Sequence, residues 1–530
     1  MSSKNESSGH KIPDQPGQDA SASEIEERKA KLAELRKAHD PYKRRFEKTH
    51  MIEALAEKAK DLKNGESLHG SKASVAGRLK SIRKHGKLIF ADLQDSSGKI
   101  QLFIDEKGMG PEKFAFFDAM INTNDIVGAH GSVLRTQRGE LSVHVDEFEL
   151  LTKSLLPLPK DWYGLKDKEL RYRKRYVDLI LNPDVRKTFD NRTKIMQAIR
   201  DFMHERGFTE VETPILQPIY GGAAARPFES KLHALDMKVY MRISNELYLK
   251  RLIVGGYEKI FEFSRDFRNE GIDKLHNPEF TQVETMWAYA DYKDNMTFAE
   301  EMFSFIAKKV HGHAKANYQG TELDMKTPWK RVRLLDAIKE HAHVDYDSLD
   351  FTEAKKAAHK AGVDAAKLDR CETWGHVVIA TFEELVQPKL IQPTLVYDYP
   401  FEAAGLAKIN KADPRLNEAF EIIINGWEMG LSYCEENDPQ RLREYWQEAE
   451  KEFKRGDDES QRMDEDFIEA LEYGMPPTSG LGVGIDRLTM LLTDAVSIRD
   501  VIMFPFMRPE AEAKPQDKPQ EKHHEKKEEK

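Results

Sequence analysis

The sequence predicts an α+β protein in which a small N-terminal β-barrel precedes a larger domain built around an antiparallel hairpin. Two observations lead to this fold class. Residues 72–152 alternate apolar and polar side chains in five short runs separated by glycines, as in a small closed barrel. Residues 261–289 alternate with the same period of two on either side of a loop, and a long amphipathic helix is predicted upstream at 186–206.

Length and composition limit the class of protein. A chain of 530 residues is long enough for more than one domain. No apolar run approaches the ~20 residues that cross a bilayer, and the first twenty residues lack a signal sequence, so we expect no membrane association and a cytoplasmic location. Two cysteines, Cys371 and Cys434, without a CxxC pair exclude a disulfide framework and a structural zinc site. The net charge of −10 leaves RNA binding open, because phosphate contacts need only a local basic patch.

Composition changes along the chain predict five parts. Residues 1–22 and 509–530 are polar and of low complexity, which predicts disordered tails. Residues 23–65 favour a charged helical extension that Pro41 divides in two; its basic side chains either contact RNA or are solvated on a helix packed against the next domain. We expect the barrel at 66–156 and the larger domain at 157–508, with a helical insertion at about 295–416.

The barrel carries a distinctive outer face. In the second and third strands the aliphatic residues share one face, which leaves Phe90, Gln101 and Phe103 on the other. One outward Phe is more often a peripheral core contact. Two of them close to basic residues such as Arg78 and Arg83 are typical of the surface with which an OB-fold binds single-stranded nucleic acid.

The hairpin has one apolar and one polar face. Phe261 and Phe263 belong to the first, whereas Arg268, Glu270 and Glu284 share the second. An arginine suits a phosphate or carboxylate and two carboxylates suit amines, so these side chains would converge on one small ligand. The alternative is a solvated ladder of salt bridges, which fits poorly with Phe280 and Met286 on the same face.

A later apolar strand contains Glu421, Glu428 and Glu435. Carboxylates in an apolar run are costly unless they are paired or bind a metal. Their spacing of seven would place successive ones on opposite faces of a regular strand, so a shared site requires a β-bulge, for which Gly426 and Gly430 are candidates.

A glycine-rich segment follows, with the sequence GLGVGIDRL. Gly480, Gly482 and Gly484 remove side chains where a nucleotide must approach, and Arg487 stands in the first turn of the next helix. The spacing fits neither a dinucleotide fingerprint nor a P-loop.

Three strings resemble the signature motifs of class II aminoacyl-tRNA synthetases, and in detail their lysyl branch. GFTEVETPIL resembles the first motif, FRNEG with HNPEFT the second and GLGVGIDRLTMLL the third, and the resemblance covers about residues 72–508. It implies an OB-fold anticodon-binding domain, an antiparallel-sheet catalytic domain, a homodimer, and the activation of lysine by ATP with Mg²⁺ before transfer to tRNA(Lys).

The resemblance also implies roles for individual residues. The ATP site comprises Arg268, Glu270, His276, Asn277, Phe280, Glu421, Glu428 and Arg487, with Arg268 catalytic and Mg²⁺ on Glu421 and Glu428; the amino-acid site comprises Gly222, Glu246, Arg268, Glu284, Met286, Leu431 and Glu435; Arg78, Phe90 and Gln101 face the anticodon. From sequence alone, Glu246 is also explained as a helix N-terminal carboxylate.

The chain departs from the family pattern at three places. Met286 replaces a tyrosine, Leu431 an asparagine, and Ala404-Gly405 a Ser-Pro step. We expect lysine to remain the substrate but to bind more weakly. Two alternatives are a class II enzyme for another amino acid, such as aspartate or asparagine, and a non-catalytic RNA-binding paralogue. Glu284 and Glu435 disfavour an acidic substrate, because they make the pocket anionic.

Overall fold

The computed structural model describes residues 22–159, 167–454 and 462–509, which form two compact units divided between Asp167 and Lys168. Both tails predicted to be disordered lie outside the described residues, apart from Ala22 and Pro509. No helix in the described ranges is long and apolar enough to cross a membrane.

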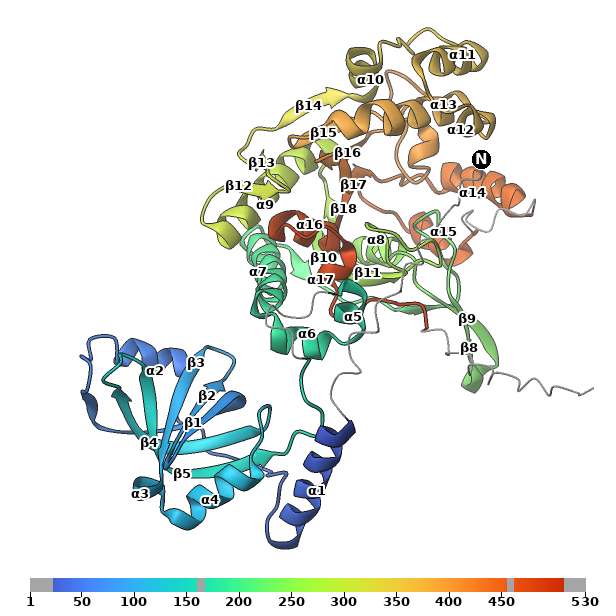
Figure 1. Cartoon of the computed structure of the whole chain (residues 1–530). Coiled ribbons are helices and arrows are strands. Elements are labelled where there is room, and N and C mark those ends of the chain that lie inside the picture. The colour runs from blue at the N-terminus through green and yellow to red at the C-terminus, as the bar shows by residue number, and fades with distance from the viewer. Residues whose placement is uncertain (1–21, 160–166, 455–461, 510–530) are drawn as a thin grey trace, which may run out of the picture. The chain divides into compact units, whose positions relative to one another are not determined.

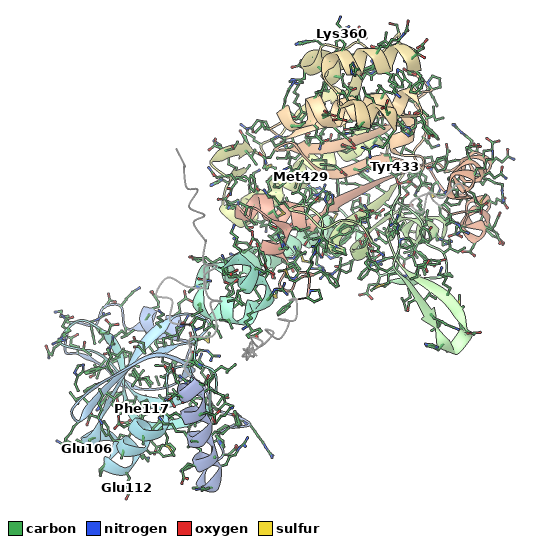
Figure 2. All side chains as sticks on the ribbon, turned by 45° about the vertical axis from the view of Figure 1, so that its right-hand side comes forward. Glu106, Glu112, Phe117, Lys360, Met429 and Tyr433 are labelled. Carbon is green, nitrogen blue, oxygen red and sulfur yellow. The ribbon has the colours of Figure 1, made fainter. Side chains whose placement is uncertain are left out.

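The first unit is a closed five-stranded barrel in the order β1-β2-β3-β5-β4 (Figure 1). Its elements are β1 (Ser67–His85), β2 (Leu88–Gln94), β3 (Lys99–Asp105), α3 (Glu106–Met109), α4 (Pro111–Met120), β4 (Ile126–Arg135) and β5 (Leu141–Thr152). The predicted OB-fold is confirmed, whereas α4, between β3 and β4, was missed. Figure 2 labels Phe117 on this helix, and its ring is buried against the barrel core.

Two helices precede the barrel, as Pro41 suggested: α1 (Ala22–Ala38) and α2 (Ile52–Lys58). Leu32 and Leu35 of α1 are buried. The guanidinium of Arg28, 1% exposed, donates hydrogen bonds to the carbonyls of Thr123 (3.0 Å) and Ser154 (3.3 Å). The helix therefore packs against the barrel and keeps most of its other basic side chains in solvent.

The second unit is built on an eight-stranded sheet, β14-β15-β16-β17-β18-β11-β10-β6, in which only β6–β10 and β14–β15 pair in parallel. In chain order the strands are β6 (Thr209–Glu210), β10 (Lys259–Phe267), β11 (Glu279–Ala288), β14 (Lys330–Arg333), β15 (Thr394–Tyr397), β16 (Ala419–Ile424), β17 (Trp427–Cys434) and β18 (Thr478–Gly484). The predicted antiparallel sheet and the hairpin of β10 and β11 are confirmed.

Helices cover one face of this sheet and enclose the main core. They are α7 (Pro183–Glu205), α9 (Tyr292–His311) and α16 (Ile485–Thr493). The predicted apolar stripe of α7 is buried here, including Ile195, Ile199 and Phe202, and it meets Phe261 and Val283 of the hairpin. The apolar face of the hairpin is therefore the core face, which leaves its polar face for the opposite side of the sheet.

The opposite side carries a second apolar cluster from α8 (Glu246–Val254), α14 (Pro439–Lys454) and α15 (Glu465–Glu472). A three-stranded sheet adjoins, with β7 (Leu216–Gln217), β8 (Glu229–Leu232) and β9 (Met237–Met241); β8 and β9 project as a hairpin in Figure 1. Short helices α5 (Lys168–Arg173), α6 (Arg175–Leu181) and α17 (Ile498–Val501) complete this part.

Residues 295–416, for which we predicted alternating helices and loops, also contain strands. A separate core is formed by α10 (Leu334–Ala342), α11 (Phe351–Ala361), α12 (Ala365–Asp369) and α13 (Trp374–Thr381). The strands β12 (Lys315–Tyr318) and β13 (Thr321–Asp324) form a hairpin of their own, and β14 and β15 extend the main sheet. Their four-residue lengths explain why alternation did not reveal them.

Candidate active site

A cavity of about 440 Å³ opens on the polar face of the hairpin. Most site residues predicted from the sequence line it, namely Gly222, Glu246, Arg268, Glu270, His276, Asn277, Phe280, Glu284, Glu428, Leu431, Glu435 and Arg487. They come from segments more than 260 residues apart in sequence, from Gly222 to Arg487. Figure 2 labels Met429 and Tyr433, two lining residues from β17, in the interior of this unit.

Strand register creates the floor of the cavity. Gly480, Gly482 and Gly484 of β18 stand opposite Met286, Glu284 and Gln282 of β11. A Cβ at Gly482 would have no neighbour closer than 4.0 Å, so its missing side chain leaves open space above the sheet. At Gly480 a Cβ would lie 2.4 Å from Glu435 Oε1, so this glycine instead permits close packing. Gly482 therefore leaves space in the cavity, whereas Gly480 serves close packing; the approach of a nucleotide to these glycines stays a prediction.

Arg268 follows β10 and lies at the middle of the site. Its guanidinium carbon is 5.1 Å from the ring centroid of Phe280, and its Nε lies 3.4 Å from the Ile243 carbonyl. Nearby, burial raises the pKa of Asp266 to about 7, against the opposing charges of Arg242 and Arg268. The cation and the ring together offer an anion site beside an aromatic stacking surface.

One end of the cavity, called the Arg487 end below, carries a guanidinium and an imidazole, each beside a carboxylate. Arg487 Nη2 lies 3.1 Å from His276 Nε2, and the other His276 ring nitrogen lies 2.8 Å from Asp273. Arg487 Nη1 donates to the Glu428 carbonyl at 2.6 Å. Glu270 is exposed at the rim, whereas the amide of Asn277 is buried and donates to the Glu279 carbonyl, which holds the loop in place.

The predicted bulge in the later strand pair is present. Ile422 pairs with Gly430 and Ile423 with Glu428, so Met429 is the additional residue. Gly430 adjoins this bulge, whereas Gly426 instead forms the β16–β17 turn with Asn425, both at positive φ. The bulge moves Glu428 onto the face that carries Glu421, which stands opposite Leu431.

Glu421 and Glu428 form a carboxylate pair. Glu421 is not among the cavity-lining residues; Tyr399 donates a hydrogen bond of 2.9 Å to its Oε2. Burial, and then the negative charge of Glu428, raise the pKa of Glu421 well above its usual value. In the described ranges no three His, Cys, Asp or Glu side chains cluster as a metal site. Two carboxylates near the Arg487 guanidinium, which lies 3.6 Å from Glu428, still fit Mg²⁺, because this ion is usually bound through one or two carboxylates and substrate phosphates.

The other end of the cavity is strongly acidic and nearly closed to solvent. Glu246, Glu284 and Glu435 are all buried and all line it. Lys250 of α8, 1% exposed, forms ion pairs with both Glu246 and Glu435. Three carboxylates against this one lysine leave two formal negative charges.

The pKa values of three ionisable groups at this end are raised. Burial, against the opposing charge of Lys250, raises the pKa of Glu435 to about 8. Burial and then Glu246 raise the pKa of Glu284 well above its usual value. Burial would lower the pKa of Lys250, but the two carboxylates outweigh it and the pKa is raised. The site therefore favours cationic groups, which would stabilise the ionised carboxylates.

Two predicted residues of this end occupy different layers. Met286 is 1% exposed and lies under the floor, where its Sδ is 3.0 Å from the position of a Cβ at Gly480. Leu431 lines the cavity directly.

Gly222 has φ of +83°, and a Cβ there would lie 3.1 Å from that of Glu246, so only glycine suits this close approach. Glu246 is in the first turn of α8, as the explanation from the helix terminus expected. Its N–H donates to Ser244 Oγ, and the side chain of the N-cap residue Asn245 forms no capping hydrogen bond.

Sequence reasoning missed several lining or supporting side chains. Lys250 lies four residues after Glu246 in a predicted helix, a spacing that places both on one face, but a buried lysine gives no other signal. Tyr433 shares the strand face of Glu435, so alternation could have found it. Tyr445 of α14 also lines the cavity, and no sequence motif marks it.

The outer barrel face has the arrangement that alternation predicted. Phe90 and Phe103 pair across β2 and β3 and stack with centroids 5.4 Å apart, and Phe103 stacks on His144 at 5.1 Å. Ser142 donates to Gln101, and Arg78 donates to the Asn124 carbonyl at 3.0 Å. His144, which alternates with buried Val143 and Val145, was missed. The face presents stacked rings beside amide and guanidinium donors, which suits unpaired bases.

Two different families of known proteins match the two units of the chain. Residues 167–508 match the family of tRNA synthetases class II (D, K and N), and residues 73–151 match the OB-fold nucleic acid binding domain. A protein of Pelotomaculum thermopropionicum named "Lysine--tRNA ligase" is 50% identical over 91% of this chain and 94% of its own length. Proteins of the same name from Carboxydothermus hydrogenoformans and Thermosynechococcus vestitus are each 49% identical, over 92% and 93% of this chain and 98% of their own.

Proposed function

This chain belongs to the class II tRNA synthetases and, among them, to the lysine–tRNA ligases, and on that basis we propose that it activates L-lysine with ATP and transfers it to tRNA(Lys). One observation supports the choice of amino acid above all. With its three carboxylates ionised, the acidic end has two formal negative charges in excess, and lysine brings two ammonium groups that would stabilise this ionised form. Its carboxylate is left for Arg268.

The proposed first step is adenylate formation. A carboxylate oxygen of lysine attacks the α-phosphorus of ATP, the bond to the bridging oxygen breaks, and pyrophosphate leaves with that electron pair. Arg268 holds the carboxylate and the α-phosphate together and stabilises charge on the phosphoryl oxygens, while its contact with Phe280 keeps the adenine-stacking ring beside it. Glu270 at the rim accepts from the adenine amino group.

The β- and γ-phosphates belong at the Arg487 end, where His276 and Arg487 meet. Mg²⁺, when bound by Glu421 and Glu428, supplies positive charge that neutralises the triphosphate. The bulge that places both carboxylates on one face supports this assignment. In the second step a terminal ribose hydroxyl of tRNA attacks the lysyl carbonyl and AMP leaves.

We also propose that the barrel binds the anticodon through Arg78, Phe90 and Gln101. The stacked pair of Phe90 and Phe103 supports this role, because every base has an aromatic face. Since none of these three residues lines the cavity, this surface should affect charging and leave lysine activation unchanged.

A homodimer is proposed from the segment that resembles the first class II motif. Ile215, Leu216 and Ile219, just after Pro214, are large apolar side chains exposed at 44%, 54% and 37%. Such a cluster is typical of a subunit interface. Sedimentation equilibrium tests it directly: a dimer is expected, and Leu216→Asp should shift the equilibrium to monomer.

A cytoplasmic location is proposed from the thiols. Cys371 and Cys434 are both free and buried, and a chain without disulfides suits a reducing compartment.

The decisive experiment is ATP–pyrophosphate exchange with each of the twenty amino acids. Lysine-dependent exchange is the expected result. Exchange with aspartate or asparagine would contradict the charge argument, and no exchange with any amino acid would favour a non-catalytic RNA-binding paralogue. Glu435→Gln and Arg268→Ala then connect the activity to the cavity.

A further inference from the structure

Tyr445 lines the cavity but has no role in the reaction proposed above. It lies on α14 and lines the cavity together with Glu402–Leu406. A Cβ at Gly405 would be 2.1 Å from the Tyr445 hydroxyl oxygen and 2.1 Å from Cζ. Gly405 has no positive φ, so its glycine is required by space and not by backbone conformation. The tyrosine ring therefore fills the volume that any side chain at 405 would take.

The ring is held firmly in this position. Phe401 packs edge-on against it, with centroids 5.7 Å apart and planes at 89°. On the same helix, Leu442 and Trp446 are buried in the apolar cluster beneath. Because these neighbours fix the helix and the ring, Tyr445 is a preformed part of the wall.

Its hydroxyl remains available to a ligand. Within the described ranges no hydrogen bond joins this hydroxyl to another residue. Burial and then the charge of Glu246 raise the pKa of Tyr445, so the phenol stays neutral. Glu246 already shares its Oε1 with Lys250. An ammonium group has three N–H donors, so one held by Glu246 can also donate to a neutral hydroxyl.

We propose that Tyr445, for whose ring Gly405 leaves space, is a specificity-determining residue of the amino-acid pocket. Its hydroxyl accepts a hydrogen bond from the ammonium group that is bound to Glu246. The proposal rests on the proposed function, since it takes the ligand to be an amino acid with an ammonium at this carboxylate. The ring in addition limits the width of the pocket at Gly405.

The first test compares Tyr445→Phe with wild type in pyrophosphate exchange. Loss of one hydrogen bond to a charged group should raise the KM for lysine about tenfold, while the KM for ATP and the Tm stay unchanged. Tyr473→Phe is the matched control, because Tyr473 is 81% exposed and does not line the cavity. An unchanged KM for lysine would overturn the proposal, and so would equal changes in both KM values with a lower Tm, which indicate a structural role.

The second test is a double-mutant cycle between positions 405 and 445. Gly405→Ala should raise the KM for lysine in the wild-type background, because the new Cβ displaces the ring. In a Tyr445→Ala background the same substitution should have no further effect. An equal effect in both backgrounds would show that Gly405 does not act through Tyr445.

The outcome separates this proposal from the proposed function. If wild type exchanges pyrophosphate with an amino acid other than lysine, the proposed substrate is wrong, and the KM for that amino acid in Tyr445→Phe still decides the role of Tyr445. If wild type uses lysine and Tyr445→Phe does so equally well, only the inference about Tyr445 fails.

Discussion

Replacing Glu435 with glutamine tests the charge balance of the acidic end with the smallest possible change of shape. Glu435 is fully buried, lines the cavity and is paired with Lys250, which keeps Glu246 as its second partner in the variant. With all remaining carboxylates ionised, the substitution lowers the formal excess of negative charge from two to one. In Glu435→Gln the ε-ammonium of the lysine substrate loses a charge-assisted hydrogen bond that contributes about 1.5–3 kcal/mol. We therefore expect the KM for lysine to rise roughly 10- to 100-fold.

The assay is pyrophosphate exchange at saturating ATP, with the KM for ATP measured separately. That KM should not change, because His276 and Arg487 lie at the other end of the cavity. Glu436→Gln is the control: Glu436 is the next residue and is also buried, but it does not line the cavity. A KM for lysine that changes less than about twofold in Glu435→Gln would refute the charge argument.

The pH dependence gives a second view of the same group. Burial raises the pKa of Glu435 to about 8. At lower pH a fraction of the enzyme molecules therefore carries a proton on Glu435, which must leave before this carboxylate can bind a cation. The KM for lysine should therefore fall as pH rises toward about 8 in wild type, and the dependence should be weaker in Glu435→Gln. Identical pH profiles would mean that another group controls binding.

Three further predictions concern other parts of the site. Arg268→Ala should lower lysine-dependent exchange by roughly 10²- to 10³-fold, as for the loss of a donor to developing charge, with an unchanged circular dichroism spectrum. Phe90→Ala and Gln101→Ala should raise the KM for tRNA in aminoacylation and spare pyrophosphate exchange, because one base–aromatic stack contributes about 1–3 kcal/mol. Met286→Tyr and Leu431→Asn should each lower the KM for lysine, up to about tenfold, by adding a polar partner, and a panel of lysine analogues should show narrower tolerance.

Each of these predictions has an outcome that would contradict it. Near-normal exchange in Arg268→Ala would show that adenylate formation does not depend on Arg268. Equal loss in both half-reactions would argue against an anticodon role for Phe90. Phe148→Ala serves as its control, since Phe148 packs against α4 inside the barrel and should lower the Tm instead of tRNA affinity. A higher KM for lysine in Met286→Tyr would show that the buried thioether belongs to the packing under the floor.

Periodicity and motif strings carried the local part of the prediction. Alternation assigned the buried and outward faces of the barrel strands, so Phe90, Gln101 and Phe103 were correctly placed. The same rule placed Phe280, Glu284 and Met286 on one face of the hairpin. It also required a bulge between Glu421 and Glu428, which is present. Strand geometry has a fixed period of two, so residues within one strand can be ordered without knowledge of the fold.

The tertiary structure decided what those faces meet. The spacing of Lys250 from Glu246 fits one helix face, but nothing in the sequence indicates that Lys250 also pairs with Glu435, which is 185 positions further along the chain. Nothing near Gly405 indicates that Tyr445 fills its empty space. The charge of the acidic end and the shape of its wall arise from contacts between distant segments, because burial and packing depend on three-dimensional neighbours. The sequence alone determined the strands of the barrel and of the hairpin, their faces and the resemblance to a family. Folding determined which charges are paired, which are in excess and how wide the pocket is.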